Sequence, residues 1–312
     1  MTEASAVLAR VTGLTHRYGE LAAIDSIDLE IPAGCMVGFI GPDGVGKSSL
    51  LGLLAGIRKI QTGSITLLGD DLRKAHHRRM LCQRIAYMPQ GLGRNLYMTL
   101  SVFENIDFFG RLFGQSREER ERHIRELLDA TGLAPFANRP AGKLSGGMKQ
   151  KLGLCCALIH TPDVLILDEP TTGVDPLSRR QFWEILLKLK TEGVTIIVST
   201  PYMDEVARAD RACFVFRGEK LAEGVPADLP RLFEGTLYYF DGPPTMETID
   251  CLNQLEKIRA RRFGGGVHVY LERGIALDNV TPALLKAGFD LKNFNPIKPD
   301  LEDCFIQLME ES

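Results

Sequence analysis

One glycine-rich stretch, residues 41–48 (GPDGVGKS), constrains the fold of this chain more than any other. It follows the apolar run Met36 to Ile40, and a second apolar run from Ser49 to Ala55 comes directly after it. This order predicts a buried strand, a tight turn and the first turns of a helix. We therefore expect an α/β fold in which the loop between strand and helix lies at a sheet edge.

The same loop has the chemistry of a phosphate site. Glycines at 41, 44 and 46 permit positive φ, so that successive backbone N–H groups can converge on one anion. The helix that follows directs the positive end of its dipole to the same place. Lys47 adds a charge for the β- and γ-phosphates of a nucleotide, and Ser48 adds a hydroxyl ligand for Mg²⁺. An ordinary strand-to-helix turn is the alternative, which the spacing in this context disfavours. The predicted nucleotide-binding residues of the loop are Gly41, Asp43, Gly44, Val45, Gly46, Lys47, Ser48 and Ser49.

Two adjacent carboxylates, Asp168 and Glu169, end the apolar run Val164 to Leu167. A central parallel strand with an active carboxyl end has this pattern. We expect Asp168 to hold Mg²⁺ through water, and Glu169 to orient or deprotonate an attacking water. Carboxylates after a strand commonly cap a helix instead, and the glycine-rich loop is what favours the catalytic interpretation.

A second candidate anion site lies at Ser145-Gly146-Gly147, before an apolar helix predicted for Leu152 to Ile159. Ser145 is a natural N-cap, and the two glycines leave backbone N–H groups accessible at the start of the helix. A capped helix start without further function explains this segment equally well.

Composition limits the partners and the compartment. The net charge is −3 and no dense basic block is present, so we expect no direct nucleic-acid binding driven by bulk charge. Seven cysteines without framework spacing fit a reducing compartment. No apolar stretch approaches the roughly 20 residues that cross a bilayer, and no signal-peptide pattern is present. We expect a cytoplasmic protein to which another chain supplies any membrane contact.

The pattern along the chain predicts two domains. Residues 1–235 form the first, with a helical insertion at about 91–160. Residues 236–312 form the second, a small α+β unit of order βαββαβ with a last helix, as in ferredoxin-like folds. His268 of this unit is expected to be a surface or core residue and not a ligand.

With the phosphate loop, Gln90, residues 144–148, the two carboxylates and Asp175 in this order, the chain resembles ABC-type ATPases over about residues 5 to 230. These are the nucleotide-binding subunits of ABC transporters. The resemblance implies a P-loop NTPase fold, which has a RecA-like core sheet, an antiparallel β subdomain and a helical insertion. It also implies ATP and Mg²⁺ as cofactors.

The resemblance assigns roles to further residues. Tyr18 would stack on adenine, and Gln90 would act in catalysis beside Lys47 and Glu169, contact Mg²⁺ and sense the transmembrane partner. Two such domains, as a homodimer or a heterodimer, would enclose ATP head to tail. Ser145, Gly146 and Gly147 of one domain would then meet the γ-phosphate held by the Lys47 loop of the other, and Asp175 would belong to the loop that crosses this interface.

Finer motifs look like those of exporter ATPases of the ABC-2 group. These are residues 144–150 (LSGGMKQ) and 299–305 (PDLEDCF). Residues 41–49 and 88–93 are similar to the first ATPase half of the ribosome-associated ATPase and its multidrug-exporter relatives. The resemblance implies ABC-2 type transmembrane subunits, drug or small-molecule efflux and a peripheral location on the inner face of the membrane. Leu96 to Phe109 is expected to touch the membrane partner. A soluble ribosome-associated ATPase is the alternative.

One position departs from the family pattern. The family normally has a histidine before Tyr-Met-Asp-Glu, and this chain has Pro201 there. Proline offers neither a side-chain donor nor a backbone N–H. We therefore expect normal ATP binding with slow hydrolysis. A binding-only half of an asymmetric pair is a further alternative.

Overall fold

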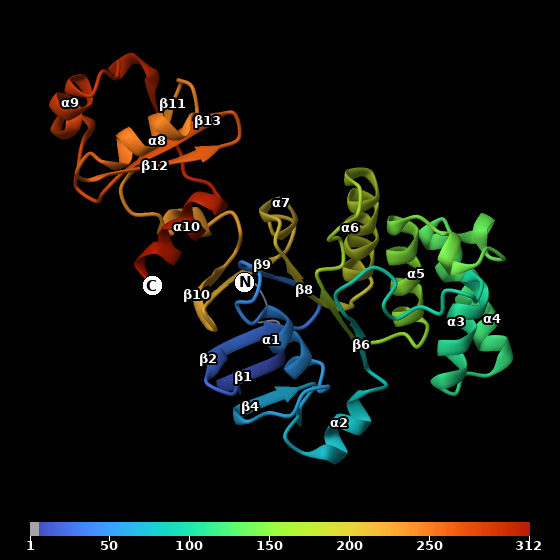
Figure 1. Ribbon diagram of the computed structural model, residues 1–312. Coiled ribbons are helices and arrows are strands. Elements are labelled where there is room, and N and C mark those ends of the chain that lie inside the picture. Colours follow the sequence, from blue (N-terminus) through green and yellow to red (C-terminus); the bar gives the residue numbers. More distant parts are fainter. Residues whose placement is uncertain (1–5) are drawn as a thin grey trace. The chain divides into compact units, whose positions relative to one another are not determined.

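The computed structural model describes residues 6–312, and the chain divides into two compact units, Met1–Pro226 and Ala227–Ser312 (Figure 1). Within residues 6–312, no helix has the length and apolar character needed to cross a membrane.

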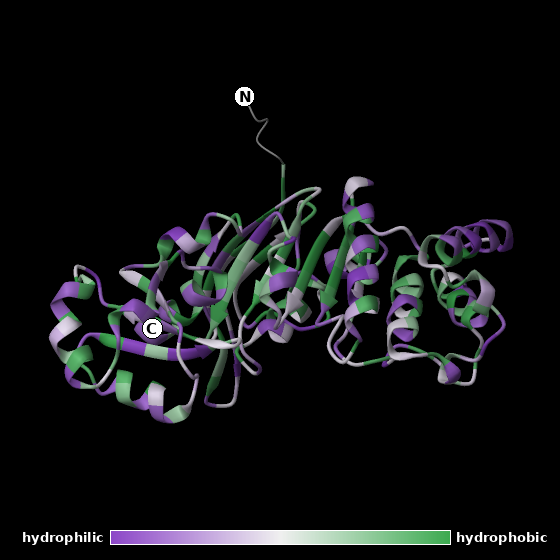
Figure 2. Ribbon diagram, turned by 90° about the horizontal axis from the view of Figure 1, so that it is seen from above, coloured by the Kyte–Doolittle hydropathy of each residue, from purple (hydrophilic) through white to green (hydrophobic). Residues whose placement is uncertain are grey.

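The first unit contains a six-stranded sheet in the order β10-β9-β3-β8-β7-β6. Neighbouring strands from β9 to β6 run parallel, and only β10 pairs antiparallel, with β9. Every residue of the three strands β3, β7 and β8 is buried. Strands β3 and β7 are almost wholly apolar, as buried parallel strands usually are, whereas β8 also buries Thr195, Ser199 and Thr200. Figure 2 shows the central strands of this unit in the hydrophobic colour. The bounds are β3 (Met36–Ile40), β6 (Ile85–Met88), β7 (Val164–Asp168), β8 (Thr195–Thr200), β9 (Arg211–Phe216) and β10 (Glu219–Gly224).

A second, antiparallel sheet of this unit has the order β2-β1-β4-β5. Its long hairpin is formed by β1 (Val7–Tyr18) and β2 (Leu21–Pro32). The hairpin places Tyr18 beside the glycine-rich loop at residues 41–48. The apolar face of the sheet shares one core with helix α1 (Lys47–Leu54) and with the larger sheet. The shorter elements are β4 (Thr62–Leu67), β5 (Asp70–Asp71) and α2 (Ala75–Leu81).

The predicted helical insertion forms a layer of its own beside strand β6 (Figure 1). Its two outer helices begin with capping boxes, at Ser101 with Glu104 and at Ser116 with Glu119. Its members are α3 (Val102–Leu112), α4 (Arg117–Thr131), the short 3₁₀ turns η1 (Ala134–Phe136) and η2 (Ala141–Lys143), and α5 (Gly146–Leu158). The remaining helices of the unit are α6 (Pro176–Thr191) and α7 (Met203–Val206).

The second unit has the expected order βαββαβ followed by a helix. Its sheet has the order β12-β13-β11-β14 with all neighbours antiparallel. His268 is a buried residue, as one of the two expected alternatives had it, and its Nδ1 lies 2.8 Å from Oδ1 of Asp303. The elements are η3 (Leu229–Leu232), β11 (Thr236–Phe240), α8 (Met246–Asn253), β12 (Ile258–Phe263), β13 (Gly266–Leu271), α9 (Leu277–Lys286), η4 (Leu291–Asn293), β14 (Phe294–Ile297) and α10 (Leu301–Glu311).

The units divide after Pro226, whereas the change in sequence character lies at Gly235. The intervening segment belongs to the second unit because it packs on its last helix. Sγ of Cys304 donates to the carbonyl of Leu229 at 3.1 Å, and the side chain of Gln307 accepts from the N–H and donates to the carbonyl of Glu234.

Candidate nucleotide site

The glycine-rich loop turns as expected at two of its three glycines. Gly44 and Gly46 have φ of 81° and 109°, and a Cβ on Gly46 would lie 1.9 Å from the carbonyl oxygen of Ala23. The expectation of a positive φ at Gly41 is wrong, because the φ of this residue is not positive. Its role is close packing, because a Cβ there would lie 2.2 Å from the carbonyl oxygen of Val215.

Lys47 is the first residue of α1 and its side chain is 4% exposed. Its Nζ donates to the carbonyl oxygens of Gly41 and Pro42 at 2.7 and 2.8 Å, and lies 3.6 Å from Oε1 of Glu169. The loop therefore holds the ammonium group beside the end of β7. A cation in this position can neutralise phosphate oxygens.

A cavity of about 360 Å³ brings most of the predicted loop residues together with residues far away in sequence. Tyr18 forms one wall, where its hydroxyl lies 3.2 Å from Oγ of Ser49. Gln90 and Glu169 form another. The lining residues are Tyr18, Leu21, Ala23, Asp43, Gly44, Gly46, Lys47, Ser48, Ser49, Gln90 and Glu169. Gly41, Val45 and Asp168 are buried behind this surface and are not part of it.

Asp168 and Glu169 are fixed by the neighbouring strand β8. Ser199 Oγ donates to Oδ1 of Asp168 at 2.7 Å, and the N–H of Glu169 lies 3.1 Å from the carbonyl of Ser199. These bonds hold Glu169 at φ of 46°, a left-handed conformation that is rare outside glycine. The pKa of Tyr87 is raised to about 12, chiefly because its side chain is buried and secondly because Asp168 carries a negative charge nearby.

The carboxylate of Glu169 contacts three other side chains of the site. Its Oε2 accepts from Nε2 of Gln90 at 2.8 Å and from Oγ1 of Thr172 at 3.2 Å, while Lys47 approaches Oε1. Strands β6 and β7 are parallel neighbours, which explains why residues following each of them meet at one edge. The arrangement can orient a water molecule next to a phosphate group.

The residues predicted for the opposing half-site form a separate cluster. Ser145 caps α5 by accepting from the N–H of Met148 at 3.3 Å, and Asp175 caps α6 by accepting from the N–H of Ser178 at 2.9 Å. This bond lowers the pKa of Asp175. A Cβ on Gly147 would lie 2.4 Å from Ser178, so the two helix starts pack closely. None of Ser145, Gly146, Gly147 or Asp175 lines the 360 Å³ cavity.

The segment around Pro201 is held by a buried carboxylate, Glu205, which is 2% exposed. Thr171 and Thr200 donate their hydroxyls to it, and Nε of Arg179 lies 3.1 Å from its Oε1. The guanidinium of Arg179 also lies 3.9 Å from the ring centre of Tyr202. This network orders the loop that carries Pro201 without placing a proton donor at position 201.

The donor set fits a nucleotide with Mg²⁺. A loop with backbone N–H groups, an ammonium group and a hydroxyl suits phosphates, and the hydroxyl and amide oxygens of Ser48 and Gln90 are ligands that Mg²⁺ prefers. The carboxylate of Asp168 lies behind the cavity surface and would act on Mg²⁺ through water. Sequence reasoning missed Leu21, Ala23, Thr172 and Ser199. The only signal for the last two was their position at the carboxyl ends of strands that meet at the site: Ser199 near the end of β8 and Thr172 after β7.

Residues 24–172 match the family model described as ABC transporter. Over 304 residues the chain is 36% identical to the "Probable multidrug ABC transporter ATP-binding protein YbhF" of Escherichia coli, covering 96% of this chain and 51% of that protein. The chain thus spans about half the length of this relative. It is 40% identical over 285 residues to the "Nod factor export ATP-binding protein I" of Burkholderia lata, covering 85% of this chain and 92% of the relative.

Solved structures of cassettes share the fold. The cbiO1 protein from Clostridium perfringens, part of the ABC transporter complex cbiONQ, superposes with a TM-score of 0.67 at 27% identity, over 72% of this chain and 90% of its own. The ATP-binding cassette MJ0796, as a dimer in a post-hydrolysis state bound to ADP and Pi, superposes with a TM-score of 0.63 at 25% identity, over 70% and 98%. With these relatives, and with the loop geometry described above, this chain belongs to the ABC transporter family, as an ATP-binding cassette with the P-loop NTPase fold.

Proposed function

We propose that this chain is the ATP-binding and ATP-hydrolysing subunit of an ABC-2 type export system, and that it couples closure of two cassettes to membrane subunits. The observation that carries the proposal is the convergence of Lys47, Ser48, Gln90 and Glu169 on one cavity. Relatives whose names refer to multidrug transport and Nod factor export support the export role.

In the proposed reaction, Lys47 and the loop N–H groups bind the β- and γ-phosphates, and Tyr18 stacks on the base. Mg²⁺ held by Ser48 and Gln90, and through water by Asp168, would neutralise charge that develops on the phosphates. Glu169 orients the attacking water and accepts its proton. Its contact with Gln90 ties that step to the start of the helical insertion.

The proposed contact with membrane subunits lies on the helical insertion. Tyr97, Phe108 and Leu112 expose 48%, 37% and 69% of their surface, which is unusual for large apolar side chains. The rings of Tyr97 and Phe108 touch edge to face, with centroids 4.8 Å apart. This patch includes part of the segment Leu96 to Phe109 and supports it as the surface for the membrane partner, with the cassette lying peripherally on the cytoplasmic side.

A binding-only half is the second candidate, because Pro201 supplies no donor to the γ-phosphate. Steady-state ATPase activity of the isolated chain separates the two. We expect slow turnover that Glu169→Gln removes. Fast turnover lost in Glu169→Gln would contradict the impaired switch, and no turnover under any condition would favour the binding-only half.

Nucleotide binding is tested separately with Lys47→Ala. We expect this variant to lose measurable affinity for ATP in equilibrium titration, because it removes the buried ammonium group. Lys59→Ala, which changes an exposed lysine after the same helix, is the matched control and should bind normally. Unchanged affinity in Lys47→Ala would count against the whole site.

A further inference from the structure

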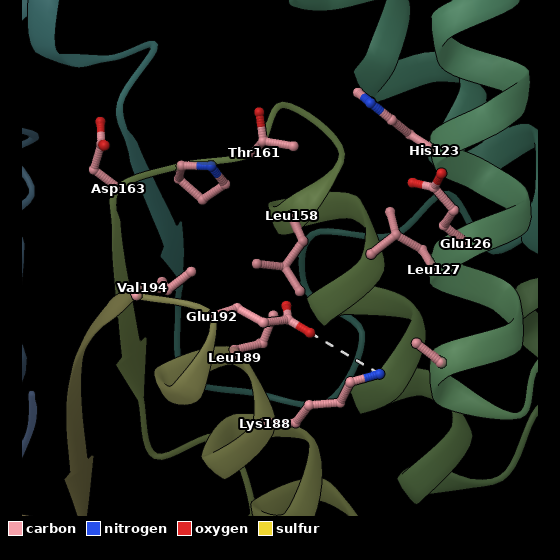
Figure 3. Close-up of a pocket in the computed structure, with 13 residues that line it drawn as sticks. His123, Glu126, Leu127, Leu158, Thr161, Asp163, Lys188, Leu189, Glu192 and Val194 are labelled. Carbon is pink, nitrogen blue, oxygen red and sulfur yellow. Dashed lines mark ion pairs between the residues drawn. The ribbon is translucent and has the colours of Figure 1, made fainter. Parts of the chain in front are cut away.

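A second cavity, of about 510 Å³, lies on the seam between the helical insertion and the core of the first unit (Figure 3). Helix α4 of the insertion contributes Glu126 and Leu127, and the end of α5 contributes Leu158. The last turns of α6 contribute Lys188 and Leu189. Asp163 and Val194 border it just before β7 and β8, at the edge of the sheet opposite Asp168 and Glu169. The cavity is therefore distinct from the nucleotide site.

The floor of this cavity is apolar. Figure 3 shows Leu127, Leu158 and Leu189 directed toward a common space from three different helices. Leu158 and Pro162 are buried, while Ala130 and Val194 complete the apolar wall. A volume of this size that combines an apolar floor with polar and charged groups at its rim is typical of small-molecule sites.

The rim is charged, and its surplus charge is negative. Lys188 lies 4.0 Å from Glu192 within the cavity wall, and Asp163 is paired with Arg84 at 2.6 Å. Glu126 is exposed at the rim, and in the part of the chain that the structure describes its carboxylate is left without an ion-pair partner. The remaining titratable group is His123, whose Nε2 lies 3.3 Å from the guanidinium of Arg122.

We propose that this cavity binds a small amphipathic organic cation, with its apolar body among the leucines and its charged group beside Glu126. The apolar floor supplies most of the affinity, while the acidic rim selects the sign of the charge. An anion of the same shape would meet the unpaired carboxylate of Glu126, because Asp163 and Glu192 are already paired with Arg84 and Lys188. A ligand in this cavity would contact α4, α5 and α6 at the same time, and it would therefore stabilise the packing of the insertion on the core.

The test uses three probes with one rigid apolar cage: 1-adamantylammonium, 1-adamantanol and 1-adamantanecarboxylate. Binding to the full chain is measured by isothermal titration calorimetry without nucleotide, so that the outcome is independent of ATPase function. We expect the ammonium to bind about 5-fold or more tightly than the carboxylate, with the alcohol between them, as a single partly exposed charge contact allows.

Two variants locate the site. Glu126→Gln should remove the preference for the cation and leave the affinity of the alcohol unchanged, whereas Glu118→Gln, an exposed carboxylate near the start of the same helix, should change nothing. Ala130→Trp, at an exposed wall position, should weaken all three probes by filling the cavity, and its ATP affinity and unfolding temperature verify the fold. Equal affinities for cation and anion, or binding that Ala130→Trp does not weaken, would overturn the proposal, as would no binding at millimolar probe.

Discussion

Ser199 fixes the carboxylate of Asp168 and the backbone of Glu169 at the end of β7. Its hydroxyl donates to Asp168, and the N–H of Glu169 donates to both its hydroxyl and its carbonyl oxygen. We predict that Ser199→Ala weakens the Mg²⁺-dependent part of ATP affinity by about 10- to 100-fold, as is usual for residues that orient a metal ligand. Affinity for ATP measured in EDTA should be unchanged. Thr191→Ala, on the exposed end of α6, is the control, and equal Mg²⁺ dependence in both variants would show that Ser199 does not orient the metal site.

Position 201 is the second feature at the scale of residues, because Pro201 stands where the family resemblance leads us to expect a histidine. The hydrogen bonds from Thr200 to Glu205 and from the N–H of Tyr202 to Thr200 already order both neighbours of position 201. A histidine introduced here would therefore lie on a loop whose backbone is already fixed. We predict that Pro201→His raises the ATPase turnover number about 10-fold or more, because it adds a donor to the transferred phosphate. Pro201→Ala relieves the backbone restriction without adding a donor and should give no such gain. If both variants accelerate the reaction equally, backbone freedom and not the missing donor limits the rate.

At the scale of elements, an ion pair joins helices α3 and α4 of the insertion. Asp107 on α3 pairs with Arg120 on α4 and, at 2.7 Å, with Arg111. Burial opposes ionisation of Asp107, but the bonds from both arginines outweigh it, so its pKa is lowered. We predict that Asp107→Asn reduces the free energy of unfolding by about 1–2 kcal/mol at neutral pH, because hydrogen bonds to charged groups are lost.

The pH dependence follows from the sign of this shift. A carboxyl with a lowered folded-state pKa stabilises the fold above its unfolded pKa of about 3.9, and this contribution disappears as the pH falls through the folded value. The stability difference between the chain and Asp107→Asn, measured by urea unfolding, should thus be constant from pH 7 to 5 and shrink below pH 4. Asp129→Asn, at an exposed position on α4, should show neither effect.

The elements around the site differ in how far sequence predicts them. Strands β3 and β7 could be predicted because buried parallel strands are continuous apolar runs. The loop at 41–48 could be predicted because phosphate binding requires its glycines, its lysine and its serine at this spacing. The alternating polarity of Val7 to Leu14 and of Ser26 to Ile31 predicts a shorter hairpin than β1–β2. The observed hairpin extends through Arg17 and Tyr18 because register shifts let polar residues continue the pairing. The Ser199 and Thr172 contacts depend on which strands become neighbours, and local pattern does not contain that information.

At the scale of the whole molecule, the first unit carries the two predicted half-sites, and they do not share a cavity within one chain. The cavity at Lys47 includes no residue of the Ser145 cluster, which caps α5 elsewhere on the unit. Both clusters have helix N-termini, and a helix N-terminus favours a bound anion. If each half-site needs the other, ATP must bring two cassettes together head to tail, either as a homodimer of this chain or as a heterodimer with a related cassette.

We therefore predict that ATP converts the Glu169→Gln variant from monomer to dimer, because this change keeps the nucleotide contacts and removes the group that activates water. Light scattering after gel filtration measures the mass with ATP, with ADP and without nucleotide. Adding Ser145→Arg to Glu169→Gln should abolish the dimer while ATP affinity of the single chain persists, since Ser145 does not line that chain's own cavity. A monomer under all three conditions would contradict the proposed pairing of two such chains, and an ATP-dependent dimer that survives Ser145→Arg would place the interface away from α5.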